Sequence, residues 1–160
     1  DISIEYKDGV QQVILNGENV TSLLRTEETG KMASKTSKYA AVRTKLVALQ
    51  RGLAKKTDVI MDGRDIGTTV LPDAFAKIYL TASSDARAKR RYDELKEKGE
   101  NCSFDAIKED IEKRDYEDMH RAISPLKQAD EAVLVDTSDM NIEQVVAALS
   151  KIIDEKKAGR

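Results

Sequence analysis

Three short apolar runs constrain the fold of this 160-residue chain more than any other feature. They lie at residues 59–61, 78–80 and 133–135, and polar residues bound the first of them. Runs of this length are too short for helices, and an uninterrupted apolar run is typical of a parallel strand that is buried on both faces. Segments with helical periodicity lie between and after them, so the pattern predicts an α/β fold with a parallel sheet.

The first 20 residues follow a different pattern. Apolar and polar residues alternate over positions 2–7, and Asp8-Gly9 and Asn16-Gly17 supply two hairpin turns. Such dipeptides beside apolar runs predict a small antiparallel meander. Because a meander does not belong inside a parallel sheet, we expect it to project as an insert. The pattern alone fits an ordinary edge hairpin equally well.

Unusual chemistry follows the first apolar run. Two carboxylates, one guanidinium and two glycines fall within residues 62–67. Open α/β sheets bind ligands just outside the carboxyl ends of their strands. Arg64 offers a planar donor fork suited to phosphate or carboxylate, and Asp65 can accept hydrogen bonds from an amino group or a hydroxyl. A solvated loop explains the composition equally well, because Asp and Gly are common turn residues.

Residues 103–121 form one helical stripe whose character changes along its length. Ser103 is a suitable N-cap. The stripe begins apolar and ends charged, through Phe104, Ile107, Ile111, Arg114, Asp118 and Arg121. A helix that leaves the core to cover a cleft has this pattern. Salt bridges along the helix are a weaker explanation, because an exposed i,i+4 pair such as Arg114–Asp118 contributes only about 0.3–0.5 kcal/mol.

Two motifs together resemble a known family. Residues 62–68, followed by Val70 and residues 72–74, resemble the signature segment of the bacterial cytidylate (CMP) kinases. Residues 113–115, with Asp118, Arg121 and residues 124–126, resemble the lid of that family and its exit. The resemblance extends in order from residue 1 to about residue 155. It implies phosphoryl transfer from ATP, with Mg²⁺, to CMP or dCMP.

The resemblance also implies the roles of individual residues. Catalytic contacts to phosphates fall to Arg64, Arg114 and Arg121. Ser34, Arg43 and Asp65 are implied to recognise cytosine, and Asp118 is implied to hold the acceptor ribose. Arg90, in a basic helix start, is implied to contact the donor ATP. Taken alone, Ser34, Arg43 and Arg90 are unremarkable residues near helix starts, and no metal ligand is predicted. His120 is not expected to be a general base, because this chemistry relies on positioning and electrostatics.

The implied fold is a three-layer nucleoside monophosphate kinase sandwich. We expect an acceptor-binding domain at residues 1–55 and a core domain at 56–160, with the lid at about 103–125. Such kinases use a GxxxxGK[ST] phosphate loop, which this sequence lacks; Met32 follows the sole Gly-Lys pair. We therefore expect an incomplete fold without its central phosphate-loop strand, and a chain that is inactive alone although its parent is an enzyme.

The composition limits the partners. Basic and acidic residues number 27 and 29, which does not favour a nucleic-acid partner. A single cysteine suits a reducing cytosol, and no apolar run is long enough for a membrane span. We expect a cytoplasmic, nucleotide-binding protein, monomeric in its parent form and prone to self-association here through exposed sheet edges. Two alternatives stay open: a non-catalytic module that lost its phosphate loop, and a kinase that prefers UMP.

Overall fold

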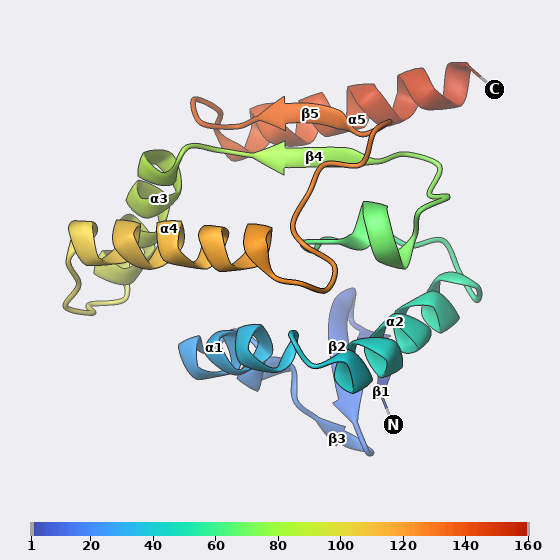
Figure 1. The fold of residues 1–160 in the computed structure, drawn as a ribbon, viewed down its shortest axis with the longest axis horizontal. Coiled ribbons are helices and arrows are strands. Elements are labelled where there is room, and N and C mark those ends of the chain that lie inside the picture. The colour runs from blue at the N-terminus through green and yellow to red at the C-terminus, as the bar shows by residue number, and fades with distance from the viewer. Residues whose placement is uncertain (1, 160) are drawn as a thin grey trace. The chain divides into compact units, whose positions relative to one another are not determined.

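The computed structural model describes residues 2–159, except for the side chain of Glu27. Asp1 and Arg160, the end residues of the two predicted domains, lie outside the described residues. The chain divides into two compact units, Asp1–Leu46 and Val47–Arg160. The fold is mixed α/β, with several helices and two small sheets (Figure 1).

The first unit begins with the meander that the sequence predicts. Strands β1 (Ile2–Lys7), β2 (Val10–Leu15) and β3 (Glu18–Asn19) pair in antiparallel order, with Lys7 opposite Val10 in the first hairpin. Asp8 has φ 53° and Gly9 has φ 77°, and Asn16 and Gly17 repeat this left-handed pair. Two successive residues with positive φ match the twist of a tight hairpin. The predicted meander is therefore confirmed.

Two helices follow a short 3-10 turn, η1 (Thr21–Leu23). Helix α1 spans Glu27–Thr36, and the side chain of Thr26 caps it by accepting from the Thr29 N–H. Helix α2 spans Ala40–Ala54 and carries an apolar stripe at helical spacing, formed by Val42, Leu46, Leu49 and Leu53. No residue of α2 is fully buried, and Leu46 is 41% exposed, so the stripe is less buried than its periodicity suggests.

The second unit contains a parallel strand pair and three capped helices (Figure 1). Strands β4 (Ile78–Thr81) and β5 (Val133–Asp136) pair in parallel, from Ile78 opposite Val133 to Thr81 opposite Asp136. The helices are α3 (Ser84–Glu97), α4 (Phe104–His120) and α5 (Ile142–Ala158). Their N-caps are Ser83, the predicted Ser103 and Asn141, and Asn141 forms a capping box with Gln144.

One of the three predicted strands is wrong. Residues 59–61 form no strand, and Ile60 is 98% exposed. A strand needs a hydrogen-bonded neighbour, and none pairs with this segment among residues 2–159. The parallel sheet therefore has two strands in the described part of the chain. Even there Leu80 and Leu134, both predicted to be buried, are about half exposed.

The buried core of the second unit is small. Its apolar members are Val70, Ala82, Ala88, Ala129 and Val135. Lys77, Asp118 and Thr137 are buried polar residues. No helix in the described range 2–159 is long and apolar enough to cross a membrane.

Candidate active site

A wide turn, and not a sheet, holds the segment that carries Arg64 and Asp65. This turn, η2, is a π-helical turn at Ile66–Val70. The Asp65 carbonyl accepts from the N–H groups of Thr69 (2.8 Å) and Val70 (3.3 Å), and Val70 is only 2% exposed. Single π-turns are frequent at functional sites. The turn thus fixes the backbone immediately after the two charged side chains.

Gly63 and Gly67 have different roles in this segment. A Cβ at position 63 would lie 2.9 Å from Ile66 Cγ1, a contact that real structures essentially never show. A Cβ at position 67 would meet only Lys77 and Ala129 at ordinary distances of 3.5 Å and more. Close approach therefore requires glycine at position 63 and merely permits it at position 67.

The second half of the site lies where α4 ends. The predicted helical stripe is wrong at its last member, because α4 ends at His120 and Arg121 has an extended backbone (φ −64°, ψ 142°). Arg121 Nε donates to the Ser124 carbonyl at 2.6 Å, and the Leu126 N–H donates to the Asp118 carbonyl at 2.7 Å. These bonds fold the chain back, so the Arg121 side chain returns beside Asp118.

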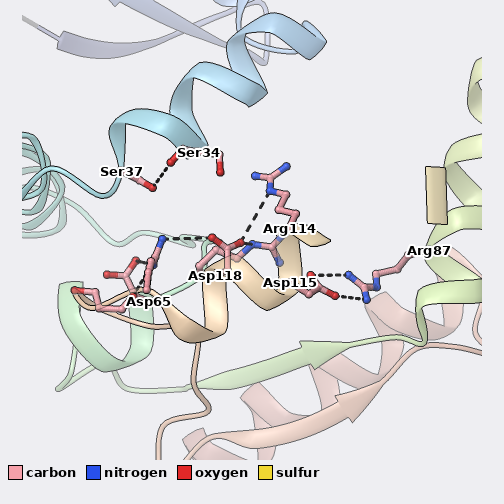
Figure 2. A network of polar contacts seen from close by, with 10 residues as sticks. Ser34, Ser37, Asp65, Arg87, Arg114, Asp115 and Asp118 are labelled. Atoms are coloured by element: carbon pink, nitrogen blue, oxygen red, sulfur yellow. Dashed lines mark hydrogen bonds and ion pairs between the residues drawn. The ribbon is translucent and has the colours of Figure 1, made fainter. Parts of the chain in front are cut away.

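Five of the predicted site residues form one carboxylate–guanidinium cluster: Arg64, Asp65, Arg114, Asp118 and Arg121. Asp118 lies at its centre (Figure 2). Its Oδ2 lies 3.1 Å from Arg64 Nε and 4.0 Å from Arg114 Nε, and its Oδ1 lies 3.5 Å from Arg121 Nη1. Arg121 Nη2 lies 3.8 Å from Asp65 Oδ1. Three guanidiniums against two carboxylates leave an excess of positive charge.

Two buried atoms of this cluster lack a hydrogen bond among the described residues. They are Asp118 Oδ2, an acceptor, and Arg121 Nη2, a donor. Asp118 Oδ2 has ion pairs with Arg64 and Arg114, and Arg121 Nη2 has one with Asp65, so both atoms are charge-compensated but can still form hydrogen bonds. A ligand that offers both a hydroxyl and an anionic oxygen satisfies both atoms. Together with the excess positive charge, this favours a polar, anionic ligand.

The other predicted residues are Arg90, which belongs to the second unit, and Ser34 and Arg43, which belong to the first. Arg90 donates to Thr137 Oγ1 at 3.3 Å, to the Thr137 carbonyl and to the Met140 carbonyl at 3.2 Å, so it ties α3 to the β5–α5 connection. Ser34 and Arg43 belong to the first unit, where Ser37 connects them. Ser37 Oγ donates to the Ser34 carbonyl at 2.8 Å (Figure 2), and Arg43 Nη1 donates to the Ser37 carbonyl at 3.5 Å.

Sequence reasoning missed Arg51, in the last turn of α2. Its Nε donates to the Val70 carbonyl at 2.9 Å and its Nη2 to the Thr69 carbonyl at 2.7 Å. No motif marks this residue. The only signal in the sequence is a cation at the end of a helix, which is usually explained by the helix dipole.

Comparisons with known proteins identify the family of this chain. The cytidylate kinase family model matches residues 1–155. The cytidylate kinase of Lactobacillus johnsonii is 50% identical over 156 residues, which is 98% of this chain and 68% of that enzyme. The enzyme from Lactobacillus gasseri is 51% identical, over 97% of this chain and 68% of its own. That from Thermosipho melanesiensis is 44% identical, over 98% and 71%.

The chain is thus related to enzymes that transfer phosphoryl groups to nucleoside monophosphates. It belongs to the cytidylate kinase family. The predicted resemblance is confirmed, and so is the assignment to nucleotide-binding transferases of the kinase class. The family uses ATP as phosphoryl donor and CMP or dCMP as acceptor.

Proposed function

We propose that this chain supplies the acceptor side of an active site that transfers phosphate from ATP to CMP or dCMP. The observation that carries the proposal is a pair of buried atoms, Asp118 Oδ2 and Arg121 Nη2, that form ion pairs but no hydrogen bond among the described residues, within a cluster that has excess positive charge. A nucleoside monophosphate offers sugar hydroxyls to the carboxylate and phosphate oxygens to the guanidinium. Both atoms are then satisfied by one ligand.

The cluster residues divide by chemistry. Arg64, Arg114 and Arg121 neutralise charge on the acceptor and transferring phosphates, and Asp118 accepts from the ribose. Charge-assisted hydrogen bonds of this kind contribute about 1.5–3 kcal/mol each. Asp65, with Ser34 and Arg43 from the first unit, recognises the cytosine base and distinguishes it from uracil. Ser37, which contacts both Ser34 and Arg43, holds those two residues in place.

Catalysis in this proposal needs no side-chain base. His120 Nδ1 lies 2.8 Å from the Tyr116 carbonyl, and its ring stacks on Tyr116 at 4.0 Å between centroids. Both contacts are made within α4 and not to the cluster. Positioned guanidiniums that stabilise charge on the transferring group account for most of the rate in phosphoryl transfer.

The donor side is proposed to lie largely outside this chain. When bound, Mg²⁺ would neutralise charge on the donor phosphates. Arg90 is proposed to contact ATP. We infer a three-layer fold that is completed by a central phosphate-loop strand, because the sequence lacks GxxxxGK[ST] and Ile60, Leu80 and Leu134 are exposed.

Three further proposals follow from this view. The chain alone is inactive as a kinase, because it lacks the loop that cradles the donor phosphates. Its exposed apolar residues make it prone to self-association, whereas the complete protein is a monomer. Nucleotides, and not nucleic acids, are its partners, and the balanced charge and single cysteine suit the cytoplasm.

Calorimetric titration tests the proposal. The chain is titrated separately with CMP, UMP and ATP, together with Asp118→Asn and a control variant, Lys89→Met, which removes an exposed ion pair with Asp93. We expect weak CMP binding, weaker UMP binding and no ATP binding. Asp118→Asn lowers CMP affinity about tenfold or more, and Lys89→Met does not. Equal binding of CMP by Asp118→Asn contradicts the acceptor role, and tight ATP binding contradicts the missing donor site.

A further inference from the structure

The guanidinium of Arg51 bridges two successive carbonyls of η2. Its Nε donates to Val70 and its Nη2 to Thr69, at 2.9 Å and 2.7 Å. Carbonyls at the end of a helical turn carry partial negative charge and lack partners within the turn. A planar guanidinium that donates to two adjacent carbonyls compensates their partial charge and also fixes their orientation. A lysine ammonium can do only the first.

The same two residues, Thr69 and Val70, also hold the Asp65 carbonyl. The N–H groups of Thr69 and Val70 donate to the Asp65 carbonyl, at 2.8 Å and 3.3 Å, while their carbonyls accept from Arg51. Arg51 is thus linked through two residues to the backbone of the residue whose carboxylate faces Arg121 Nη2. Hydrogen bonds in such a chain polarise and strengthen one another.

No strand pairing holds the stretch before η2 within residues 2–159. The stretch before it, residues 58–62, has no regular secondary structure, and Ile60 is 98% exposed. After it, Val70 is buried. In place of the strand ladder that usually fixes a residue at the end of a strand, a side chain from α2 holds the turn.

We propose that Arg51 is a positioning residue for the acceptor site: it holds η2 so that Asp65 and Arg64 meet the nucleotide. This inference rests on the proposed function, because it takes Asp65 and Arg64 to contact CMP. Arg51 itself touches no substrate. Helix α2 also carries Arg43, so one helix contributes a proposed base contact near its start and the brace of η2 in its last turn.

The test uses the 160-residue chain and three variants. Arg51→Gln removes the charge and the fork, and Arg51→Lys keeps the charge but loses the fork. Lys45→Gln is the matched control, because it removes an exposed cation from the same helix. Three properties are measured for each: CMP affinity by calorimetry, unfolding midpoint, and hydrogen exchange of the amides of residues 69–71.

We expect Arg51→Gln to weaken CMP binding about ten- to a hundredfold, because a small misplacement of contact groups has an effect of this size. The CMP affinity of Arg51→Lys should lie between those of Arg51→Gln and the wild type. Exchange at Thr69 and Val70 becomes at least about tenfold faster in Arg51→Gln, and Lys45→Gln resembles the wild type in both properties. If Arg51 only stabilises the fold, Arg51→Gln lowers the unfolding midpoint but leaves the CMP affinity of the folded chain unchanged. That result overturns the inference.

Failure of the two proposals can be told apart. If the wild-type chain binds no CMP, the proposed acceptor function falls. In that case unchanged exchange at Thr69 and Val70 in Arg51→Gln also overturns the bracing of η2, and faster exchange keeps the bracing but removes its link to CMP. If the wild type binds CMP and Arg51→Gln binds it equally well, the positioning role alone is wrong.

Discussion

The second unit holds two groups of charged side chains, and they pair in different ways. Along the α3–α4 seam, Arg87 makes two hydrogen bonds to Asp115, at 3.1 Å and 2.5 Å (Figure 2), and Lys108 Nζ lies 2.8 Å from Asp85 Oδ1. In the carboxylate–guanidinium cluster the ion-pair distances run from 3.1 to 4.0 Å. Asp118, at the centre of the cluster, is buried, yet two buried atoms of the cluster have no hydrogen bond among the described residues.

The difference shows what each group does. The seam residues satisfy one another, so helix packing is a sufficient explanation for them. The cluster gathers charged groups around the buried Asp118 but does not complete their hydrogen bonds. This costs stability unless a ligand supplies the missing bonds. Seam variants should therefore change stability, and cluster variants should change nucleotide binding and turnover.

The largest expected effect is that of Arg121→Ala, measured in the complete protein that carries this chain. We expect turnover to fall at least about 100-fold, because the guanidinium makes charge-assisted bonds to the transferring phosphate. The unfolding midpoint falls less, since the bond to the Ser124 carbonyl is one of few that Arg121 contributes to the fold. A drop in midpoint with unchanged turnover would remove Arg121 from the cluster's function and weaken the comparison.

A pair of glycine variants gives the next largest effect. In Gly63→Ala the new methyl group would lie 2.9 Å from Ile66 Cγ1, so either the Ile66 side chain or the backbone beside Arg64 and Asp65 has to shift. We expect CMP affinity to fall about tenfold, as a contact group displaced by a fraction of an ångström does. Gly67→Ala is the control, because its methyl group meets neighbours only at ordinary distances. Equal affinities for the two variants would contradict the close approach at Gly63.

A seam variant provides the contrast. Arg87→Met keeps the aliphatic stem but removes both bonds to Asp115 and one to the Ala82 carbonyl. Both partners of the pair are partly buried, so we expect a loss of about 1–2 kcal/mol in unfolding free energy by denaturant titration. Turnover of the complete protein should stay within about threefold of the wild type, as for a residue that makes no transition-state contact. A turnover loss like that of Arg121→Ala would erase the distinction between the two groups.

Much of the fold could be predicted because its signals are local. Asp8-Gly9 and Asn16-Gly17 adopt the left-handed pairs that their residue types favour, and Ser103 caps α4 as expected. Residues 59–61 show the limit. Their composition favours a strand, but a strand depends on a neighbour that lies elsewhere in the sequence, and no such neighbour pairs with them in the described chain.

The site divides in the same way. The spacing of Arg114 and Asp118 along one helix predicts that they lie together, and the structure brings them to 4.0 Å. Periodicity could not predict that α4 stops at His120, because the reversal depends on Ser124 with its positive φ. Nor could it predict Arg51, whose partners are two backbone carbonyls that any sequence would offer.

The smallest expected effect concerns the ion pair between Lys77 and Glu131, which lies close to η2 but outside the cluster. Lys77 is buried, its stem lies beside Gly67, and its ammonium pairs with the exposed carboxylate of Glu131. The hydrogen bond from Lys77 lowers the pKa of Glu131 below its ordinary value of 4.5. A carboxyl whose folded pKa is depressed stabilises the fold above its unfolded pKa, and that stability is lost as the pH falls through the folded value.

Glu131→Gln should therefore lower the unfolding midpoint by less than about 4 °C at pH 7. The difference from the wild type should shrink as the pH falls below 4.5, where protonation removes the same charge from the wild type. CMP affinity at pH 7 should not change, because Lys77 and Glu131 satisfy each other as the seam residues do. Thermal unfolding from pH 3 to pH 8 measures the first effect and calorimetry the second. A fall in CMP affinity would mean that satisfied pairing does not separate structural charges from functional ones in this protein.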